Sequence, residues 1–219
     1  MNVSVEGVRH SYSGSERRAA LSVPRLAIGS GERMCLVGRS GSGKTTLLNV
    51  LAGVLVPTAG RVHLGEVELS ALSEPARDAF RGRSIGCVFQ TFNLLDQLSA
   101  LENLTLAQRF GGIAPEPARR RARELLAELG LAERENARPS ELSLGEQQRL
   151  AIARAVSKRP SLVLADEPTA SLDDENARAA LDLLLSSAAG STLVVATHDA
   201  RVIERFARVT TMADLSGVS

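Results

Sequence analysis

The chain has 219 residues, of which 44% are hydrophobic, and this length and composition suit one globular unit with a substantial core. Its formal net charge is only +1, which gives no bulk electrostatic support for nucleic-acid binding. No apolar run reaches the ~20 residues of a membrane-spanning helix, and the amino-terminal residues do not resemble a signal peptide. Any role at a membrane is therefore expected to depend on a partner.

The first third of the chain is predicted to consist mainly of strands. Val3, Val5 and Val8 alternate with polar neighbours, as in a half-buried strand. Further strands are expected at 21–28, 33–37, 61–69 and 84–89, with a helix at 44–52.

Helical spacing begins in the middle of the chain, where helices are expected at 101–110 and 117–129. Pro117 suits a first turn and Gly130 a carboxyl-terminal cap. A run of basic residues in the second helix is interpreted as a solvated face rather than a binding patch: Arg119, Arg120, Arg121 and Arg123.

Strands and helices alternate in the last third. We expect strands at 162–165, 192–196 and 208–212, the last at a sheet edge, and helices at 173–187 and 199–206. Because the unbroken apolar run at 162–165 suits a strand covered on both faces, the pattern predicts an α/β fold with a parallel sheet and flanking helices.

The two cysteines, Cys35 and Cys87, lie in apolar stretches outside any cluster of metal ligands. We interpret them as small buried hydrophobic residues, with a disulfide as the alternative. Free thiols fit a reducing, cytosolic compartment.

Residues 38–45 read GRSGSGKT and match G-x-x-x-x-G-K-[ST], the pattern of a phosphate-binding P-loop. Glycines let the backbone turn its N–H groups toward phosphate oxygens, and the helix that follows adds the positive end of its dipole. The alternative is a simple glycine-rich turn, which the strand before and the helix after disfavour. The expected nucleotide contacts are Gly38, Arg39, Ser40, Gly41, Ser42, Gly43, Lys44, Thr45 and Thr46. Lys44 is expected to reach the β- and γ-phosphates.

Two adjacent acids, Asp166 and Glu167, end the apolar run at 162–165. Two carboxylates beside an apolar core are costly unless something compensates them. Mg²⁺ would do so for Asp166, together with the hydroxyl of Thr45, and Glu167 would then polarise the attacking water as a general base. The alternative is a pair of surface acids, which the P-loop disfavours.

Four further motifs follow in order. Residues 141–149 read ELSLGEQQR, Gln90 ends a strand, residues 171–173 read SLD, and His198 follows the strand at 192–196. With the P-loop and the paired acids, this order resembles the ATP-binding subunits of ABC (ATP-binding cassette) transporters over essentially the whole chain.

The resemblance implies a P-loop NTPase core with a mixed, mainly parallel sheet, an N-terminal antiparallel β-subdomain and an inserted α-helical subdomain. It implies a single ABC ATPase domain spanning 1–219. About 1–90 and 160–219 would form the core with the β-subdomain, and about 91–159 the helical signature subdomain.

The resemblance also implies the site. Two copies would sandwich two ATP molecules with Mg²⁺, and Ser143 and Gly145 would face the γ-phosphate held by the second copy. Glu146 and Asp173 would lie near the same nucleotide. The catalytic residues would be Lys44, Gln90, Glu167 and His198, and the metal contacts Thr45, Gln90 and Asp166.

Several of these residues have a structural alternative. Ser143 with Glu146 also forms a capping box, and both roles are expected because a capped helix end is itself an anion site. Ser171 with Asp174 is expected to form a second capping box. Tyr12 resembles the family's adenine-stacking aromatic, with packing on the core as the alternative.

One signature residue, Leu144, departs from the family, which has glycine there. We expect activity to survive this change.

Residues 89–95, 98–103 and 164–169 resemble the lipoprotein-releasing, macrolide-export and cell-division subgroup. Such a subunit sits peripherally on the cytoplasmic side of the inner membrane and grips a separate permease, here near Thr91–Asp96. Many related import ATPases instead carry an added carboxyl-terminal domain, whereas this chain ends soon after His198.

Three functions compete on this resemblance. The first is an ATPase that drives export or extraction of a lipid, lipoprotein or drug-like substrate. The second is an ATPase that drives periplasmic signalling or cell division. The third, a soluble ATPase of DNA repair or translation, is disfavoured because the chain has no coiled-coil insertion, no tandem second ATPase domain and no basic bias.

Overall fold

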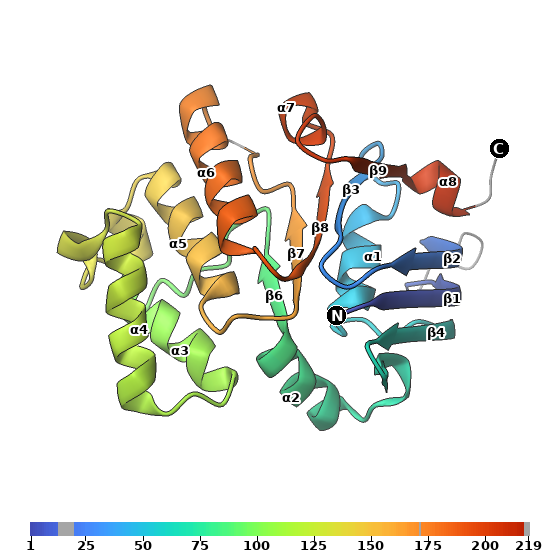
Figure 1. The fold of residues 1–219 in the computed structure, drawn as a ribbon, viewed down its shortest axis with the longest axis horizontal. Helices are drawn as coiled ribbons and strands as arrows, with labels where there is room; N and C mark the ends of the chain where they lie inside the picture. Colours follow the sequence, from blue (N-terminus) through green and yellow to red (C-terminus); the bar gives the residue numbers. More distant parts are fainter. Residues whose placement is uncertain (13–19, 171, 217–219) are drawn as a thin grey trace.

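The computed structural model describes residues 1–12, 20–170 and 172–216, and Figure 1 shows two sheets with helices between and beside them. An antiparallel sheet has the order β2-β1-β4-β5. It consists of β1 (Val3–His10), β2 (Leu21–Ile28), β4 (Ala59–Leu64) and β5 (Val67–Glu68). Its strands alternate buried and exposed residues because only one face is covered.

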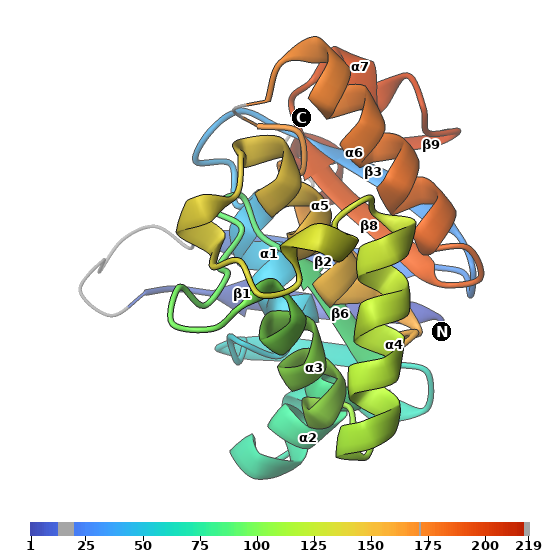
Figure 2. The same cartoon turned by 90° about the vertical axis from the view of Figure 1, so that its left-hand side faces the viewer.

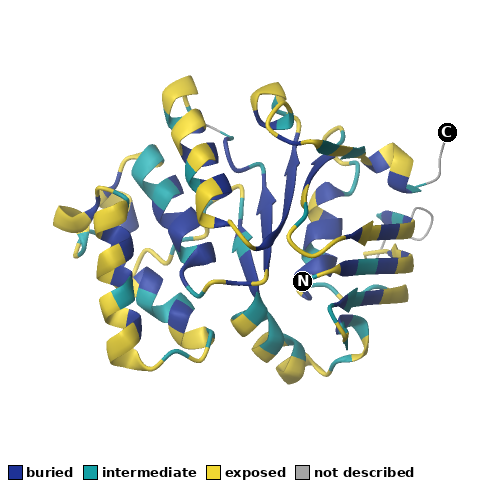
Figure 3. Ribbon diagram, viewed as in Figure 1, coloured by how far each residue is buried: buried dark blue, intermediate teal, exposed yellow. Residues whose placement is uncertain are grey.

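The second sheet is parallel between every pair of neighbouring strands, in the order β6-β7-β8-β3-β9. Its members are β3 (Arg33–Val37), β6 (Ile85–Val88), β7 (Leu162–Asp166), β8 (Thr192–Thr197) and β9 (Arg208–Thr211). Every residue of β7 and β8 is buried (Figure 3). The predicted α/β class, the strand at 162–165 and the edge position of the last strand are confirmed.

Helices cover both faces of the parallel sheet. Met34 and Leu36 of β3 point into a core shared with α1 (Lys44–Leu51) and the antiparallel sheet. Cys35, between them, points into a second core. That core includes residues of α5 (Leu144–Val156), α6 (Asp174–Ser187) and α7 (Ala200–Ile203). The alternation of faces along β3 thus joins both layers through one strand.

A third core holds the helical part together. It forms between α3 (Ala100–Phe110), α4 (Pro115–Glu128) and α5, the helices that face the viewer in Figure 2. Gly130 follows α4 with a φ of 69°, as a helix end requires. Arg121 pairs with Glu124 and Glu128 at the surface, which fits the solvated face expected for the basic run. Short 3-10 turns connect these helices at Ala132–Arg134 and Pro139–Glu141.

Two predictions between residues 61 and 84 need correction. The single strand expected at 61–69 is two strands, because Gly65 turns the chain with a φ of 62° and a 3-10 turn starts at Leu69 (Leu69–Ala71). The helix α2 (Glu74–Ser84) was not predicted. It contains no fully buried residue, so it lacks the apolar stripe by which a helix is recognised in sequence.

The carboxyl-terminal prediction also needs a small correction. The strand expected at 208–212 stops at Thr211, and Met212 begins the short helix α8 (Met212–Ser216).

Both cysteines are free thiols, as expected, although Cys87 is only partly buried. Burial raises the pKa of Cys35 and of Cys87 to about 11, so both stay protonated. No helix in the described ranges combines the length and the apolar character that crossing a membrane requires.

Gly86 tests the contact between β6 and α5. A Cβ atom at Gly86 would overlap the carbonyl oxygen of Ala155. Because a backbone carbonyl cannot move aside, Gly86→Ala should lower the free energy of unfolding by about 1–3 kcal/mol. Gly29→Ala is the matched control, since its Cβ atom would meet only the movable end of Glu32 at 3.3 Å. Chemical denaturation measures both, and equal stability of the two variants would contradict the packing argument.

Candidate functional site

The P-loop connects β3 to α1 in a tight turn. Gly43 precedes α1 with a φ of 96°, a left-handed conformation that glycine adopts without strain. A Cβ atom at Gly38 would overlap the Ser42 hydroxyl, so the loop has no room for a side chain there. The sequence 38–45 therefore folds as predicted, with its backbone exposed at the start of a helix.

Lys44, the first residue of α1, turns back over this loop. Its Nζ atom donates a hydrogen bond to the Gly38 carbonyl at 2.7 Å and lies 3.6 Å from Oε1 of Glu167. Only 8% of the Lys44 side chain and 11% of the Glu167 side chain are exposed. The Lys44 ammonium and the Glu167 carboxylate, which are distant in sequence, thus form an ion pair that is largely shielded from solvent.

Thr45 and Asp166 form a second contact beside the loop. The Thr45 hydroxyl donates to Oδ2 of Asp166 at 2.6 Å. Burial raises the pKa of Asp166, and this hydrogen bond opposes the shift. A carboxylate that is costly to bury would gain from a cation beside it.

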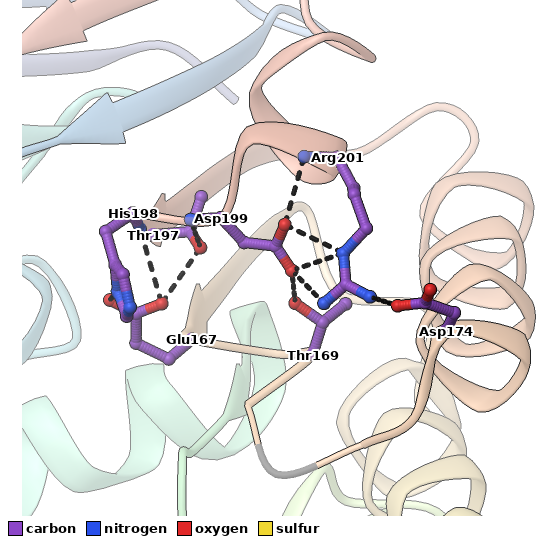
Figure 4. A network of polar contacts seen from close by, with 7 residues as sticks. All are labelled: Glu167, Thr169, Asp174, Thr197, His198, Asp199 and Arg201. Carbon is purple, nitrogen blue, oxygen red and sulfur yellow. Dashed lines mark hydrogen bonds and ion pairs between the residues drawn. The ribbon is translucent and has the colours of Figure 1, made fainter.

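Glu167 sits at the end of β7 with a φ of 47°, which costs a residue other than glycine about 1–3 kcal/mol. Its carboxylate is fixed from β8 (Figure 4). The Thr197 hydroxyl donates to Oε2 at 2.9 Å, and Nδ1 of His198 lies 2.8 Å from Oε1. Glu167 and His198, which were predicted separately as site residues, are therefore in contact, while the His198 side chain stays 76% exposed.

A second network in Figure 4 was not predicted from the sequence. Arg201 holds both Asp199 oxygens, at 2.7 Å from NH2 to Oδ2, and its NH1 group pairs with Asp174. Thr169 donates to Asp199 at 3.0 Å. Arg201 is the main reason that the pKa of Asp199 falls to about 2. The segment after His198 is thereby tied to the start of α6.

One sequence signal could have pointed to this network, because the polar residues Thr197 and Asp199 flank the predicted site residue His198. Arg201 and Asp174 carried no such signal, because they are distant in sequence and share no motif.

Gln90 and Tyr12 lie near the edges of the site. Gln90 is exposed two residues beyond β6, whose Val88 is opposite Ala165 of β7, so the end of β6 lies beside the end of the strand that carries the carboxylate pair. The Tyr12 hydroxyl lies 3.2 Å from that of Thr46, and 48% of Tyr12 is exposed. The Tyr12 ring meets the His10 ring edge-on, with 5.0 Å between the ring centroids, so Tyr12 is half-exposed beside the P-loop rather than enclosed in the core.

Ser143 caps α5 as predicted. Its hydroxyl accepts from the Glu146 N–H at 3.3 Å, and the Glu146 carboxylate accepts from the Ser143 N–H at 2.8 Å. The Ser143 N–H and hydroxyl lower the pKa of Glu146. In Figure 1, α5 lies across β6, β7 and β8 from α1, so one chain does not bring the signature residues to its own P-loop.

Gly145 is where α5 meets α6. A Cβ atom there would overlap the amide of Asn176, and Asn176 is held by Asp173 through its N–H and its side-chain amide, both at 2.8 Å. Asp173 is thus the amino-terminal cap of α6. The capping box predicted from Ser171 and Asp174 depends on Ser171, which lies outside the described residues. The signature motif and Asp173 are linked through Asn176.

Leu144, the residue that departs from the family, is 54% exposed in the first turn of α5.

The residues present fit a magnesium nucleotide. In the described part of the chain, the Ser42 hydroxyl is buried without a hydrogen-bond partner, which leaves a donor pointing into the loop. Thr45 and Asp166 offer the hard oxygen atoms that Mg²⁺ prefers. No group of three or more metal-binding side chains was found among the described residues, and Mg²⁺ in nucleotide sites needs only one or two carboxylates besides substrate phosphates.

The loop before α1 and the carboxylates at the end of β7 define a P-loop nucleotide-binding fold. The ABC transporter family profile matches residues 21–170. The chain therefore belongs to the ATP-binding subunits of ABC transporters.

Known relatives are similar to this chain over nearly its full length. The lipoprotein-releasing system ATP-binding protein LolD 1 of Rhodospirillum rubrum is 42% identical, over 96% of this chain and 94% of its own. LolD of Pseudomonas syringae pv. tomato is 44% identical, over 94% of each. The dimeric post-hydrolysis structure of the ATP-binding cassette MJ0796, bound to ADP and Pi, is 37% identical with a TM-score of 0.87, over 95% of this chain and 93% of that one. The expected fold class and the resemblance to the lipoprotein-releasing subgroup are confirmed.

Ser143 has a matched control in Ser99, which forms the same capping box with Glu102 at the start of α3. Ser143→Ala and Ser99→Ala should each lower the free energy of unfolding by about 1 kcal/mol through loss of the cap. If Ser143 also contacts phosphate, only Ser143→Ala should lower ATP turnover, by about 10-fold or more. Denaturation and ATPase assays separate the two effects. Equal turnover of the two variants would leave Ser143 with a structural role alone.

Proposed function

We propose that this chain hydrolyses ATP between two copies of itself and passes the resulting movement to a membrane permease. The observation that carries the proposal is the cluster of Lys44, Glu167 and His198 beside the P-loop. It combines a phosphate-binding cation with a carboxylate fixed at the mouth of the loop. The signature residues Ser143 and Gly145 lie on another face, so the site is complete only with a second copy.

Glu167 is the proposed general base. Its carboxylate is held by Thr197 and by His198, which fixes its direction before substrate arrives. It would accept a proton from the attacking water, and Lys44 would shift from Glu167 to the phosphate oxygens. His198, mostly exposed, would contact the γ-phosphate and hold Glu167 in place.

Thr45 and Asp166 are the proposed Mg²⁺ contacts, with Gln90 reaching the ion from the end of β6. The ion, when bound, would neutralise charge on the phosphates. The nine residues from Gly38 to Thr46 would enclose the phosphates. Tyr12 would stack on the adenine.

The dimer is supported by the relative MJ0796, which was solved as a dimer with ADP and Pi. In the proposed arrangement, Ser143, Gly145 and Glu146 of one copy would face the nucleotide on the other, and Asp173 would lie at the same boundary. Binding of ATP would close the dimer, because each nucleotide then touches both copies, and hydrolysis would reopen it.

The permease is proposed to dock near Thr91–Asp96. This segment borders a partly apolar cavity that includes Asn93 and Leu95. The ATPase would then lie peripherally on the cytoplasmic side of the inner membrane. The LolD relatives are named as parts of a lipoprotein-releasing system, which supports extraction or export of a lipid or lipoprotein as the work performed.

Glu167→Gln tests the general base. The amide keeps the shape and still accepts from Thr197, but it cannot take a proton, so turnover should fall about 10²–10⁴-fold. Nucleotide binding should persist, and the variant should accumulate as an ATP-bound dimer. Phosphate release and size-exclusion chromatography with ATP measure the two effects. Near-normal turnover would remove Glu167 as the base.

A further inference from the structure

A cavity of about 270 Å³ lies between β6, α3 and α5, next to the loop at 91–96. Its walls include Phe89, Leu106 and Phe110, and Phe110 is 69% exposed. The volume is below the roughly 300–1,000 Å³ of pockets that enclose a drug-sized ligand. The cavity therefore suits one or two side chains of a docking segment better than a free small molecule.

Two cations, Arg154 and Lys158, line this cavity, whose other walls are mostly apolar. Arg154 donates to the backbone carbonyl of Phe92 at 2.7 Å and also to that of Asn93. Lys158 donates to the carbonyl of Arg81 at 3.1 Å. Among the described side chains, no carboxylate lies within ion-pair distance of Arg154 or Lys158. Both positive charges are thus matched only by neutral oxygens.

The groups packed around Lys158 do not supply the missing negative charge. Burial lowers the pKa of Lys158 to about 8, and Arg81 on α2 acts in the same direction. Of the two acids on that helix, Asp78 is engaged with Arg81 at 2.6 Å, and Glu74 lies in the first turn, at the opposite end from Arg81. The Cys87 thiol on β6 stays protonated, with its pKa raised by burial to about 11. The site therefore has a net positive charge in a partly dehydrated place.

We infer that this cavity receives a cytoplasmic segment of the permease that carries an Asp or Glu side chain between apolar residues. The carboxylate would lie beside Arg154 and Lys158, and the apolar neighbours would pack on Phe110. The inference rests on the proposed permease partner and adds the charge that this partner must present. Two cations would compensate a carboxylate that is buried there. Binding of an acidic permease segment would therefore be favoured, and binding of a basic one disfavoured.

Cross-linking tests the contact directly, because Lys44 and Lys158 are the only lysines in the sequence. The chain is first purified as a complex with a permease encoded in the same genome, chosen because it co-purifies with the chain. A water-soluble carbodiimide then adds to a carboxylate to give an O-acylisourea, and a lysine amine in contact attacks its acyl carbon, which forms an amide and releases the urea derived from the carbodiimide. We expect mass spectrometry to find Lys158 joined to an Asp or Glu of the permease. An intact complex in which Lys158 joins no permease carboxylate would overturn the inference.

Charge variants test whether the contact matters. Lys158→Glu should weaken the complex, and the ATPase stimulation by the permease, about 10-fold or more. Lys158→Arg should retain both. The ATPase of the isolated chain should not change, since Lys158 lies outside the nucleotide site. Arg109→Gln, which removes an exposed cation of α3 outside the cavity, is the matched control and should leave the complex intact. Changing the cross-linked carboxylate to Lys should restore binding to Lys158→Glu.

The pH dependence gives a second readout. Lys158 is fully charged below its pKa of about 8, and a carboxylate beside it would raise that pKa in the complex. Affinity should be constant below about pH 8 and fall as pH rises above it. In Lys158→Arg the fall should disappear, because Arg remains charged. A fall of equal size in both would show that another group titrates and would contradict the inference.

The remaining outcomes separate the proposals. If no permease associates with the unmodified chain, the proposed function is wrong about its membrane partner. If a permease binds equally well to Lys158→Glu, only the present inference is wrong. Binding to vesicles of anionic phospholipid without permease, lost in Lys158→Glu, would show that the ligand is a lipid headgroup and would also overturn it.

Discussion

The pairing of Lys44 with Glu167 is the contact on which the site depends. A nearly buried ion pair is rarely kept for stability, since the cost of removing both charges from water offsets most of the attraction. Here each member comes from a different strand of the parallel sheet, Lys44 after β3 and Glu167 after β7, and His198 follows β8 between them. The strand order β7-β8-β3 therefore decides that these groups meet. The cores on both faces of the sheet serve to hold those strand ends in register.

Much of this arrangement could be predicted from sequence because its signals are local. The P-loop, the carboxylates after an apolar run and the capping box at Ser143 each lie within a few residues, and each folds as expected. Contacts between distant residues gave no such signal: Arg201 with Asp174, and Gly145 with Asn176, join segments that share no motif. The α2 helix was missed for a related reason, since it buries no side chain completely.

The α5 helix connects the two proposed contact surfaces. Its amino-terminal end carries Ser143 and Gly145, which would face a second copy. Arg154 in its last turn and Lys158, two residues beyond its end, line the cavity proposed for the permease. With 13 residues it is about 20 Å long. It is packed into two cores, against α6 on one side and against α3 and α4 on the other, which favours movement of the whole helix as one unit. A shift imposed at the nucleotide would thus reach the permease end without bending of the helix.

The position of β3 has a consequence for the order in which the protein acquires structure. Within the described residues, this strand at 33–37 pairs with β8 and β9 alone, which lie more than 150 residues later. During synthesis on the ribosome, β3 has no partner until nearly the whole chain has emerged. The P-loop is anchored by β3, so nucleotide binding by a partly made chain should be negligible. Such long-range parallel pairing also slows folding and leaves apolar strands exposed in the meantime. This chain is accordingly expected to need chaperone protection early, when its amino-terminal third is already synthesised.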